Sequence, residues 1–595
     1  MNSGTYIHNP DTGTWFRTGY QSIGYSDGPE SEKHLLSVVQ QCGDVSTQSV
    51  ELLIHIIDWP SEYHLSPARN NLLRSIEIGP QHKVLELGCG CGAMTRYLGE
   101  TGATVVAVEG SKRRAQIAAS RCRDLPNVTI YCDNLIYFHC DEKFDFVTLI
   151  GVLEYSPKFI ESNDPVARCL GHARSFLNID GALILAIENQ LGLKYFNGCL
   201  EDHVGIPYYG INDLYGDANP VTFGRHELSE KLGAAGFPTQ EFFYPFPDYK
   251  LPRLVLSEEA LSDSRLNLAD LLVHNSGRDY PETHHRAFAE NLAWRALIRN
   301  RLVPDLANSF LVIARMSHPS RRKIDWLAKM YSRGRRQPCY QIESIISAAP
   351  TDHLVVRKRK LFPDATERAN TWLDHVVADS TYLPGNLFLV KIHEAMAREA
   401  SITDLAALVN PWLQLLLARA TTDKHGALIL PGHFIDCIPA NVIESPTGDL
   451  HYFDAEWVSR TNIPLSWVLI RGVVDCVHRS LGNRSVKMET YRSFISKIAS
   501  NSGISLDERD FSIADEWESR LSHLCHADSE SAHALSRIFD EPLHLLDRFR
   551  PDLEYQLNRH EIEIMRIKNT FSWRVTAPLR VVWNLLFRTH KGEAQ

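Results

Sequence analysis

The chain has 595 residues, more than one hydrophobic core organises, so about two to four domains are expected. With 44% hydrophobic and 23% charged residues it has the profile of a globular protein. A formal net charge of −10 gives no positive field for nucleic acid, so no nucleic-acid partner is expected. The 12 cysteines form no CxxC pair, and no apolar signal segment or membrane span is apparent, so we expect a cytoplasmic protein with free thiols.

The first part of the chain predicts an α/β domain. Residues 1–70 are expected to form an N-terminal extension. Strands then alternate with helices, and the strand candidates are 83–87, 104–108, 128–132, 144–149, 182–187, 240–244 and 308–314. This order predicts a doubly wound, mostly parallel Rossmann-like sheet over residues 71–316, with helices on both faces.

A glycine-rich turn follows the first of these strands, in Glu86-Leu87-Gly88-Cys89-Gly90-Cys91-Gly92. Such glycines let the backbone approach a ligand, and Glu109, at the end of the second strand, can bind a ribose diol. The turn also fits a dinucleotide fingerprint, which leaves a nicotinamide oxidoreductase as an alternative. Glu86 favours a methyl donor, because its carboxylate can bind an amino group but would repel a pyrophosphate. Asp133 ends the third strand, where an acid can meet an adenine amine.

Together these motifs resemble the class I S-adenosylmethionine-dependent methyltransferases. The resemblance covers about residues 75–316. It implies a binding site for S-adenosylmethionine formed by Glu86, Gly88, Gly90, Gly92, Glu109 and Asp133. It also implies that Glu154 faces the methyl acceptor and takes a catalytic role.

Two later segments, 187–203 and 244–252, resemble a subgroup found beside bacterial glycan-assembly enzymes. The resemblance implies an acceptor pocket for a glycan or another sugar-containing molecule. Tyr195 and Tyr249 can stack on a sugar, and His203 can act as a general base for a hydroxyl. Alternatively, Asp202 and His203 only hold a loop in place. Methyl transfer depends so much on positioning that a base is not essential.

Residues 317–535 predict a second, α+β domain with strands at 339–346 and 353–361. Asn441 lies five residues after Asp436, and Asp454 lies thirteen residues after Asn441. This spacing is typical of phosphotransfer. It resembles the aminoglycoside and choline phosphotransferase branch of the kinase fold. The resemblance implies Asp436 as the catalytic acid, Asn441 and Asp454 as ligands of the metal in Mg-ATP, and Lys358 at the phosphates.

This second domain departs from the kinase pattern in two respects. Residues 345–350 stand where a glycine-rich loop is expected, and His433 precedes Asp436 by three residues instead of two. The sequence therefore leaves open an active kinase and an inactive module kept for binding.

Residues 536–595 predict a helical, amphipathic tail, interrupted by Pro578. Its tryptophans and arginines suit a membrane interface or a partner groove, or the tail packs on its own protein. Similar tails occur on bacterial glycosyltransferases. The prediction is a methyltransferase acting on an oxygen of a glycan or glycan precursor in bacterial surface polysaccharide biosynthesis, peripheral at the inner membrane. The alternatives are a dual methyltransferase and kinase that caps polysaccharide chains, and a scaffold that recruits glycosyltransferases.

Overall fold

The computed structural model describes residues 6–545 except 218, 276–286, 318–323, 333–334, 399, 479–483 and 528–534. The predicted tail over 536–595 lies almost entirely outside these residues. Within the part of the chain that is described, no helix combines the length and the apolar character needed to cross a lipid bilayer.

The predicted parallel sheet is present. Strands β5, β4, β3, β6 and β7 lie side by side in that order and all pair in parallel. Strand β10 then pairs antiparallel with β7 and with β8. The bounds are β3 Lys83–Leu87, β4 Thr104–Glu109, β5 Val128–Cys132, β6 Phe144–Ile150, β7 Leu177–Glu188, β8 Thr239–Phe246 and β10 Ser309–Arg315. All seven strands overlap the predicted ones, which confirms the mostly parallel α/β architecture.

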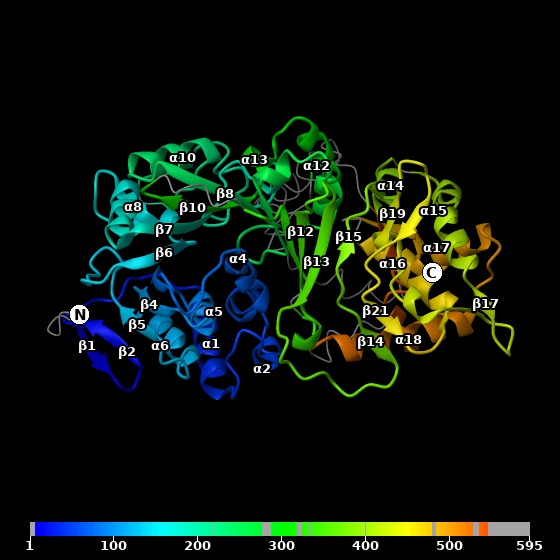
Figure 1. Ribbon diagram of the computed structural model, residues 1–595, viewed down its shortest axis with the longest axis horizontal. Helices are drawn as coiled ribbons and strands as arrows, with labels where there is room; N and C mark the ends of the chain where they lie inside the picture. Colours follow the sequence, from blue (N-terminus) through cyan, green and yellow to red (C-terminus); the bar gives the residue numbers. More distant parts are fainter. Residues whose placement is uncertain are drawn as a thin grey trace, which may run out of the picture. The chain divides into compact units, whose positions relative to one another are not determined.

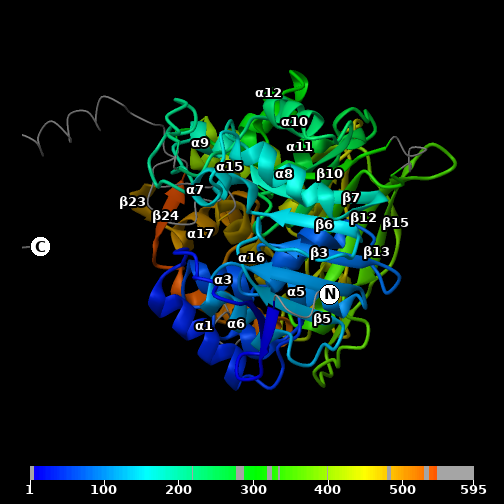
Figure 2. The same ribbon diagram turned by 90° about the vertical axis from the view of Figure 1, so that its left-hand side faces the viewer.

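Helices cover both faces of this sheet, as expected for a doubly wound fold (Figures 1 and 2). Leu85 and Val147 point toward α8 (Pro165–Ser175) and α10 (Arg225–Ala234). Val84 points the other way, into a core shared with two helices, α5 (Ala93–Glu100) and α6 (Lys112–Arg121). Because both faces are covered, the strands are continuous apolar runs.

The first 70 residues are part of this domain. Strands β1 (Tyr6–Asn9) and β2 (Thr14–Arg17) form a hairpin, and β2 pairs in parallel with β5. The hairpin thereby covers the edge that β5 would otherwise expose. Four helices follow: α1 Pro29–Gln41, α2 Val50–Leu53, α3 Trp59–Leu65 and α4 Asn71–Arg74. Leu35 and Val39 of α1 pack in one core with Ile117 of α6.

The same sheet also includes strands from the part of the chain after residue 316. Beyond β8 come β9, β11, β12, β13 and β15, each antiparallel to its neighbour. Their bounds are β9 Leu254–Ser257, β11 Ala328–Tyr331, β12 Ile342–Ala348, β13 Leu354–Lys360 and β15 Ser380–Thr381. The pairing of β9 with β11 thus crosses the predicted boundary between residues 316 and 317. The chain between β6 and β10 also forms short helices, namely α7 Ser156–Phe159, α9 Leu193–Phe196, α11 Leu268–Val273, α12 Glu290–Arg299 and α13 Val303–Leu306.

The remainder is mainly helical and surrounds a second core that contains Trp412 and Trp467. Its helices are α14 Phe388–Ala397, α15 Ile402–Leu417, α16 Leu465–His478, α17 Tyr491–Asn501 and α18 Glu508–Cys525. Its short strands are β14 Leu373–His375, β16 Asn386–Leu387, β17 Thr421–Thr422, β18 Leu428–Leu430, β19 Val442–Glu444, β20 Leu450–Tyr452, β21 Trp457–Ser459, β22 Ile463–Pro464, β23 Arg484–Thr490 and β24 Pro542–Leu545. The indole of Trp412 donates a hydrogen bond to the carbonyl of Cys437 at 2.8 Å, which ties α15 to the segment carrying Asp436.

The two ends of β7 offer a matched test of this burial. Leu185 is fully buried between helices, whereas Ile179 is 80% exposed on the same strand. We expect Leu185→Ala to lower the free energy of unfolding by about 2–5 kcal/mol through lost packing and cavity formation. Ile179→Ala should change it by less than about 0.5 kcal/mol. Urea unfolding followed by circular dichroism measures both, and equal effects would contradict the assignment of the core.

Candidate functional site

A cavity of about 370 Å³ opens at the carboxyl ends of the parallel strands. Ligands bind at this edge in open α/β sheets, because loops there diverge and backbone groups are free. One end of the cavity is lined by the glycine turn after β3 and by Glu109 at the end of β4. The other end is lined by Glu154, Glu188 and His203. The sequence predictions for both ends therefore meet in one cavity.

The backbone of the turn requires glycine at two lining positions. Gly88 and Gly90 have φ angles of +82° and +57°. A Cβ atom at Gly88 would lie 2.5 Å from Cγ2 of Val152, and one at Gly90 would lie 2.9 Å from Nη2 of Arg114. Larger residues would therefore close the cavity at this end or strain the turn.

Gly92 has a different role from the predicted one. It begins α5 with a φ of +80° but does not line the cavity. A Cβ atom there would lie 2.8 Å from Cα of Ala118 in α6. Its missing side chain thus lets α5 approach α6.

Glu109 and Glu86 place two buried carboxylates beside the turn. Oε2 of Glu109 accepts a hydrogen bond from the amide of Gly90, and Oε1 accepts one from the amide of Ser111, each at 2.8 Å. Each oxygen keeps capacity to accept a bond from a diol hydroxyl. Glu86 accepts a bond from the hydroxyl of Thr95 at 2.6 Å. Burial raises the pKa of Glu86 to about 7, although the Thr95 bond acts in the opposite direction.

Asp133 does not lie where the resemblance placed it. Its carboxylate is fully buried and accepts bonds from Nε of Arg17 at 2.7 Å and from the hydroxyl of Tyr6 at 2.8 Å. It is not part of the cavity wall, whereas the next residues, Asn134 and Leu135, are. The geometry therefore assigns Asp133 to anchoring the β1–β2 hairpin, in place of the predicted contact with adenine.

The N-terminal segment supplies a wall that the sequence analysis missed. Tyr25, Asp27 and His64 line the cavity. Nε2 of His64 lies 2.8 Å from Oδ2 of Asp27, and the hydroxyl of Tyr25 lies 3.2 Å from that of Tyr155. Burial raises the pKa of Asp27, but the bond to His64 and the charge of Arg114 outweigh it and hold the pKa at about 2. No local motif marks these residues, since their contacts join distant parts of the chain.

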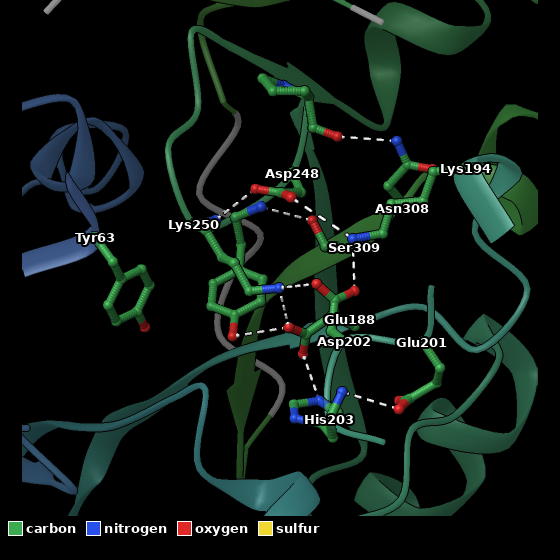
Figure 3. Close-up of polar contacts among 12 residues, drawn as sticks. Tyr63, Glu188, Lys194, Glu201, Asp202, His203, Asp248, Lys250, Asn308 and Ser309 are labelled. Carbon is green, nitrogen blue, oxygen red and sulfur yellow. Dashed lines mark hydrogen bonds and ion pairs between the residues drawn. The ribbon is translucent and has the colours of Figure 1, made fainter. Parts of the chain in front are cut away.

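The other end of the cavity holds a buried network of charges (Figure 3). Nζ of Lys250 lies 2.6 Å from Oε1 of Glu188 and 2.6 Å from Oδ1 of Asp202. Nζ of Lys194 lies 2.6 Å from Oδ2 of Asp202. The amide of His203 donates to Oε2 of Glu201 at 2.9 Å. Asp202 is thus held by two lysines.

The two predicted sugar-stacking tyrosines differ. Tyr249 lines the cavity, and its hydroxyl donates to Glu188 at 3.3 Å. Tyr195 is buried behind the wall and donates its hydroxyl to Asp202. Of these two tyrosines, Tyr249 is therefore the one that lies in the cavity wall.

Glu154 and His203 lie together. The surroundings of His203 favour its protonated form, whereas the predicted general base requires the neutral form. Burial and then the charge of Glu188 raise the pKa of Glu154 to about 8. Burial would lower the pKa of His203, but Glu188 and Glu154 outweigh it and raise the pKa to about 9. An imidazole that keeps its proton at neutral pH has no free lone pair, so this geometry does not favour His203 as a general base.

The predicted phosphotransfer residues also come together, in a separate cluster. Nδ2 of Asn441 donates to Oδ2 of Asp436 at 2.9 Å, and Nη1 of Arg471 lies 2.8 Å from Oδ1 of Asp436. Lys358 on β13 forms an ion pair with Asp454. Burial raises the pKa of Asp436 to about 6 against the effect of Arg471.

Comparison with known protein sequences identifies the first domain. Residues 85–183 match a family model described as a methyltransferase domain. Demethylmenaquinone methyltransferase of Tropheryma whipplei is 37% identical over 71 residues, which are 12% of this chain and 30% of the relative. Ribosomal RNA small subunit methyltransferase A of Streptococcus pneumoniae is 39% identical over 70 residues, 11% of this chain and 24% of the relative. The chain thus spans less than a third of these relatives' length.

Among solved structures, the CcbJ methyltransferase from Streptomyces caelestis is 15% identical, covers 46% of this chain and 100% of its own, and has a TM-score of 0.28. The 1,6-didemethyltoxoflavin-N1-methyltransferase of Burkholderia thailandensis, with bound S-adenosylhomocysteine, is 15% identical at a TM-score of 0.24 and covers 42% of this chain and 77% of its own. Likenesses this low support no argument here. The family match shows a methyltransferase domain over residues 85–183, which contain the glycine turn and strands β4, β5 and β6.

The glycine turn gives a direct test of the cofactor end. Gly90→Ala should weaken binding of S-adenosylhomocysteine by at least about 10-fold, because the new Cβ meets Arg114 in a left-handed backbone conformation. Gly171→Ala is the matched control, since a Cβ atom there meets nothing within 4 Å. Titration calorimetry measures both affinities, and an unchanged affinity in Gly90→Ala would refute the site.

Proposed function

We propose that this protein transfers a methyl group from S-adenosylmethionine to an oxygen atom of a glycan or glycan precursor in bacterial surface polysaccharide biosynthesis. The observation that carries the proposal is the continuity of one cavity, which joins the glycine turn to a buried acidic and aromatic end.

The cofactor end fits S-adenosylmethionine by the nature of its groups. Gly88 and Gly90 would let the backbone approach the methionine part, Glu86 would receive its amino group, and Glu109 would accept the ribose hydroxyls. When bound, the cofactor supplies a methyl group activated by a sulfonium centre. Glu86 also weighs against the nicotinamide alternative, because a carboxylate at this turn disfavours a pyrophosphate.

The acceptor end suits a hydroxyl group on a sugar. Both carboxylate oxygens of Glu154 are buried without a hydrogen-bond partner, so they are available to a hydroxyl donor. Tyr63, Tyr155 and Tyr249 contribute ring surface to the same cavity, which suits the apolar face of a pyranose. As the acceptor oxygen gains the methyl group, its proton would pass to the carboxylate of Glu154, and the tyrosine rings would hold the acceptor in place.

For the second half we propose a kinase-like module. The gathering of Asp436, Asn441, Asp454 and Lys358 supports it. The direct ion pair of Lys358 with Asp454 uses both groups that would hold Mg-ATP. The stretch 345–350, which lacks glycine where a glycine-rich loop is expected, supports a scaffold with a degenerate nucleotide site over a dual methyltransferase and kinase. In the same proposal, residues 536–595 recruit a glycosyltransferase or bind the inner membrane.

Glu154→Gln tests the acceptor end. Turnover with S-adenosylmethionine and a sugar acceptor should fall by at least about 100-fold, while the affinity for S-adenosylhomocysteine stays within about 2-fold. The readout is radiolabelled methyl transfer to a panel of oligosaccharides and nucleotide sugars. The acceptor assignment fails if the variant turns over like the wild type, or if only nitrogen acceptors are methylated.

Calorimetric titration with Mg-ATP tests the second half. The lack of glycine in residues 345–350 predicts no binding at millimolar nucleotide. Heat of binding that disappears in Asp454→Ala would instead establish a working nucleotide site and favour the dual enzyme.

A further inference from the structure

The acceptor end of the cavity contains a connected network of buried acids and bases. Among the described residues, the connected network has five carboxylates, those of Glu154, Glu188, Glu201, Asp202 and Asp248. Three bases contact them, namely Lys194, Lys250 and His203. Buried polar and charged groups are stable only when they are paired, hydrogen-bonded or bound to a metal.

Three of these side chains converge on one point. One carboxylate oxygen each of Glu154 and Glu188 and one ring nitrogen of His203 all lie within 4.8 Å of one another. Both glutamates are fully buried, and the His203 side chain is 5% exposed. Donor atoms on one divalent cation with bonds of about 2.1 Å lie about 3 to 4 Å apart, so small side-chain movements close the set.

The converging atoms also have unused bonding capacity. Among the described residues, neither oxygen of Glu154 has a hydrogen-bond partner, while Oε2 of Glu188 and Nε2 of His203 form an ion pair at 3.4 Å. Buried polar atoms of this kind normally have a partner. The other atoms of the same groups are held in place: Oε1 of Glu188 by Lys250, and Nδ1 of His203 by the hydroxyl of Tyr155 at 3.1 Å.

We propose that Glu154, Glu188 and His203 bind a divalent transition-metal cation at the acceptor end of the cavity. Two carboxylates and one imidazole suit Mn²⁺, Fe²⁺ or Zn²⁺, whereas Mg²⁺ and Ca²⁺ prefer oxygen ligands alone. The contact of Tyr155 with Nδ1 orients the ring, as the outer partners of metal-bound histidines do.

Three protein ligands leave coordination positions open toward the cavity. Open positions distinguish catalytic metal sites from structural ones, which are closed by protein ligands. If the proposed function holds, an acceptor hydroxyl takes one of these positions and is positioned and acidified there. Binding of the cation itself does not depend on that function.

The test is binding of Mn²⁺ alone to the full chain after treatment with a chelator, without cofactor, nucleotide or acceptor. Equilibrium dialysis with elemental analysis, and the loss of the free-ion paramagnetic resonance signal, should give one ion per chain. Glu154→Gln and Glu188→Gln should each weaken binding by about 100-fold or more, since losing an outer partner alone costs about 10–100-fold. The carboxylate of Glu154 has no hydrogen-bond partner to lose among the described residues, so its variant carries the test if Glu188→Gln does not fold.

Glu109→Gln is the matched control, because it alters a buried carboxylate at the opposite end of the same cavity. Glu109→Gln should bind Mn²⁺ like the wild type and lose affinity for S-adenosylhomocysteine. Glu154→Gln should lose affinity for Mn²⁺ and bind S-adenosylhomocysteine like the wild type. No stoichiometric Mn²⁺ in the wild type, or an unchanged affinity in Glu154→Gln, overturns the metal site. Mn²⁺ binding without S-adenosylhomocysteine binding would instead contradict the proposed function and leave the metal site standing.

Discussion

The central constraint of this fold is that helices cover both faces of its parallel sheet. Side chains along β3, β4, β6 and β7 therefore meet apolar cores on either side, and polar groups are placed where the strands end. Glu109, Glu154 and Glu188 all lie at or just beyond the carboxyl ends of these strands. One edge of the sheet thus gathers the acids, and the glycine turn leaves room for a ligand beside them.

The charge network gives the two ends of the cavity different chemistry. At the cofactor end, Glu109 is held by two backbone amides and keeps a fixed position. At the acceptor end, Lys250 fixes Glu188, while the carboxylate of Glu154 has no hydrogen-bond partner among the described residues. A carboxylate held in a fixed position suits recognition of one constant ligand. A buried carboxylate without a hydrogen-bond partner suits contact with a group whose charge or protonation changes during a reaction. The N-terminal wall with Asp27 and His64 joins both ends.

Local patterns predicted the parts of the site that depend on one strand and its turn. The strand 83–87 was predicted at its observed bounds because an apolar run ends at glycines, and the positions of Glu86, Glu109 and Glu154 follow from strand ends. Tertiary contacts decided the rest. Asp133 ends its strand as predicted, but Arg17, 116 residues away in the chain, occupies its carboxylate. The protonation of His203 depends on Glu188 at the end of β7 and on Glu154 in the segment after β6, a combination that no local pattern contains.

A structure of the full chain with bound S-adenosylhomocysteine tests the central claim most directly. The ribose hydroxyls should lie on Glu109, the methionine part along Gly88 and Gly90, and the sulfur should be directed toward Glu154. A ligand bound elsewhere, or one whose ribose lies away from Glu109, would contradict the assignment of the cavity.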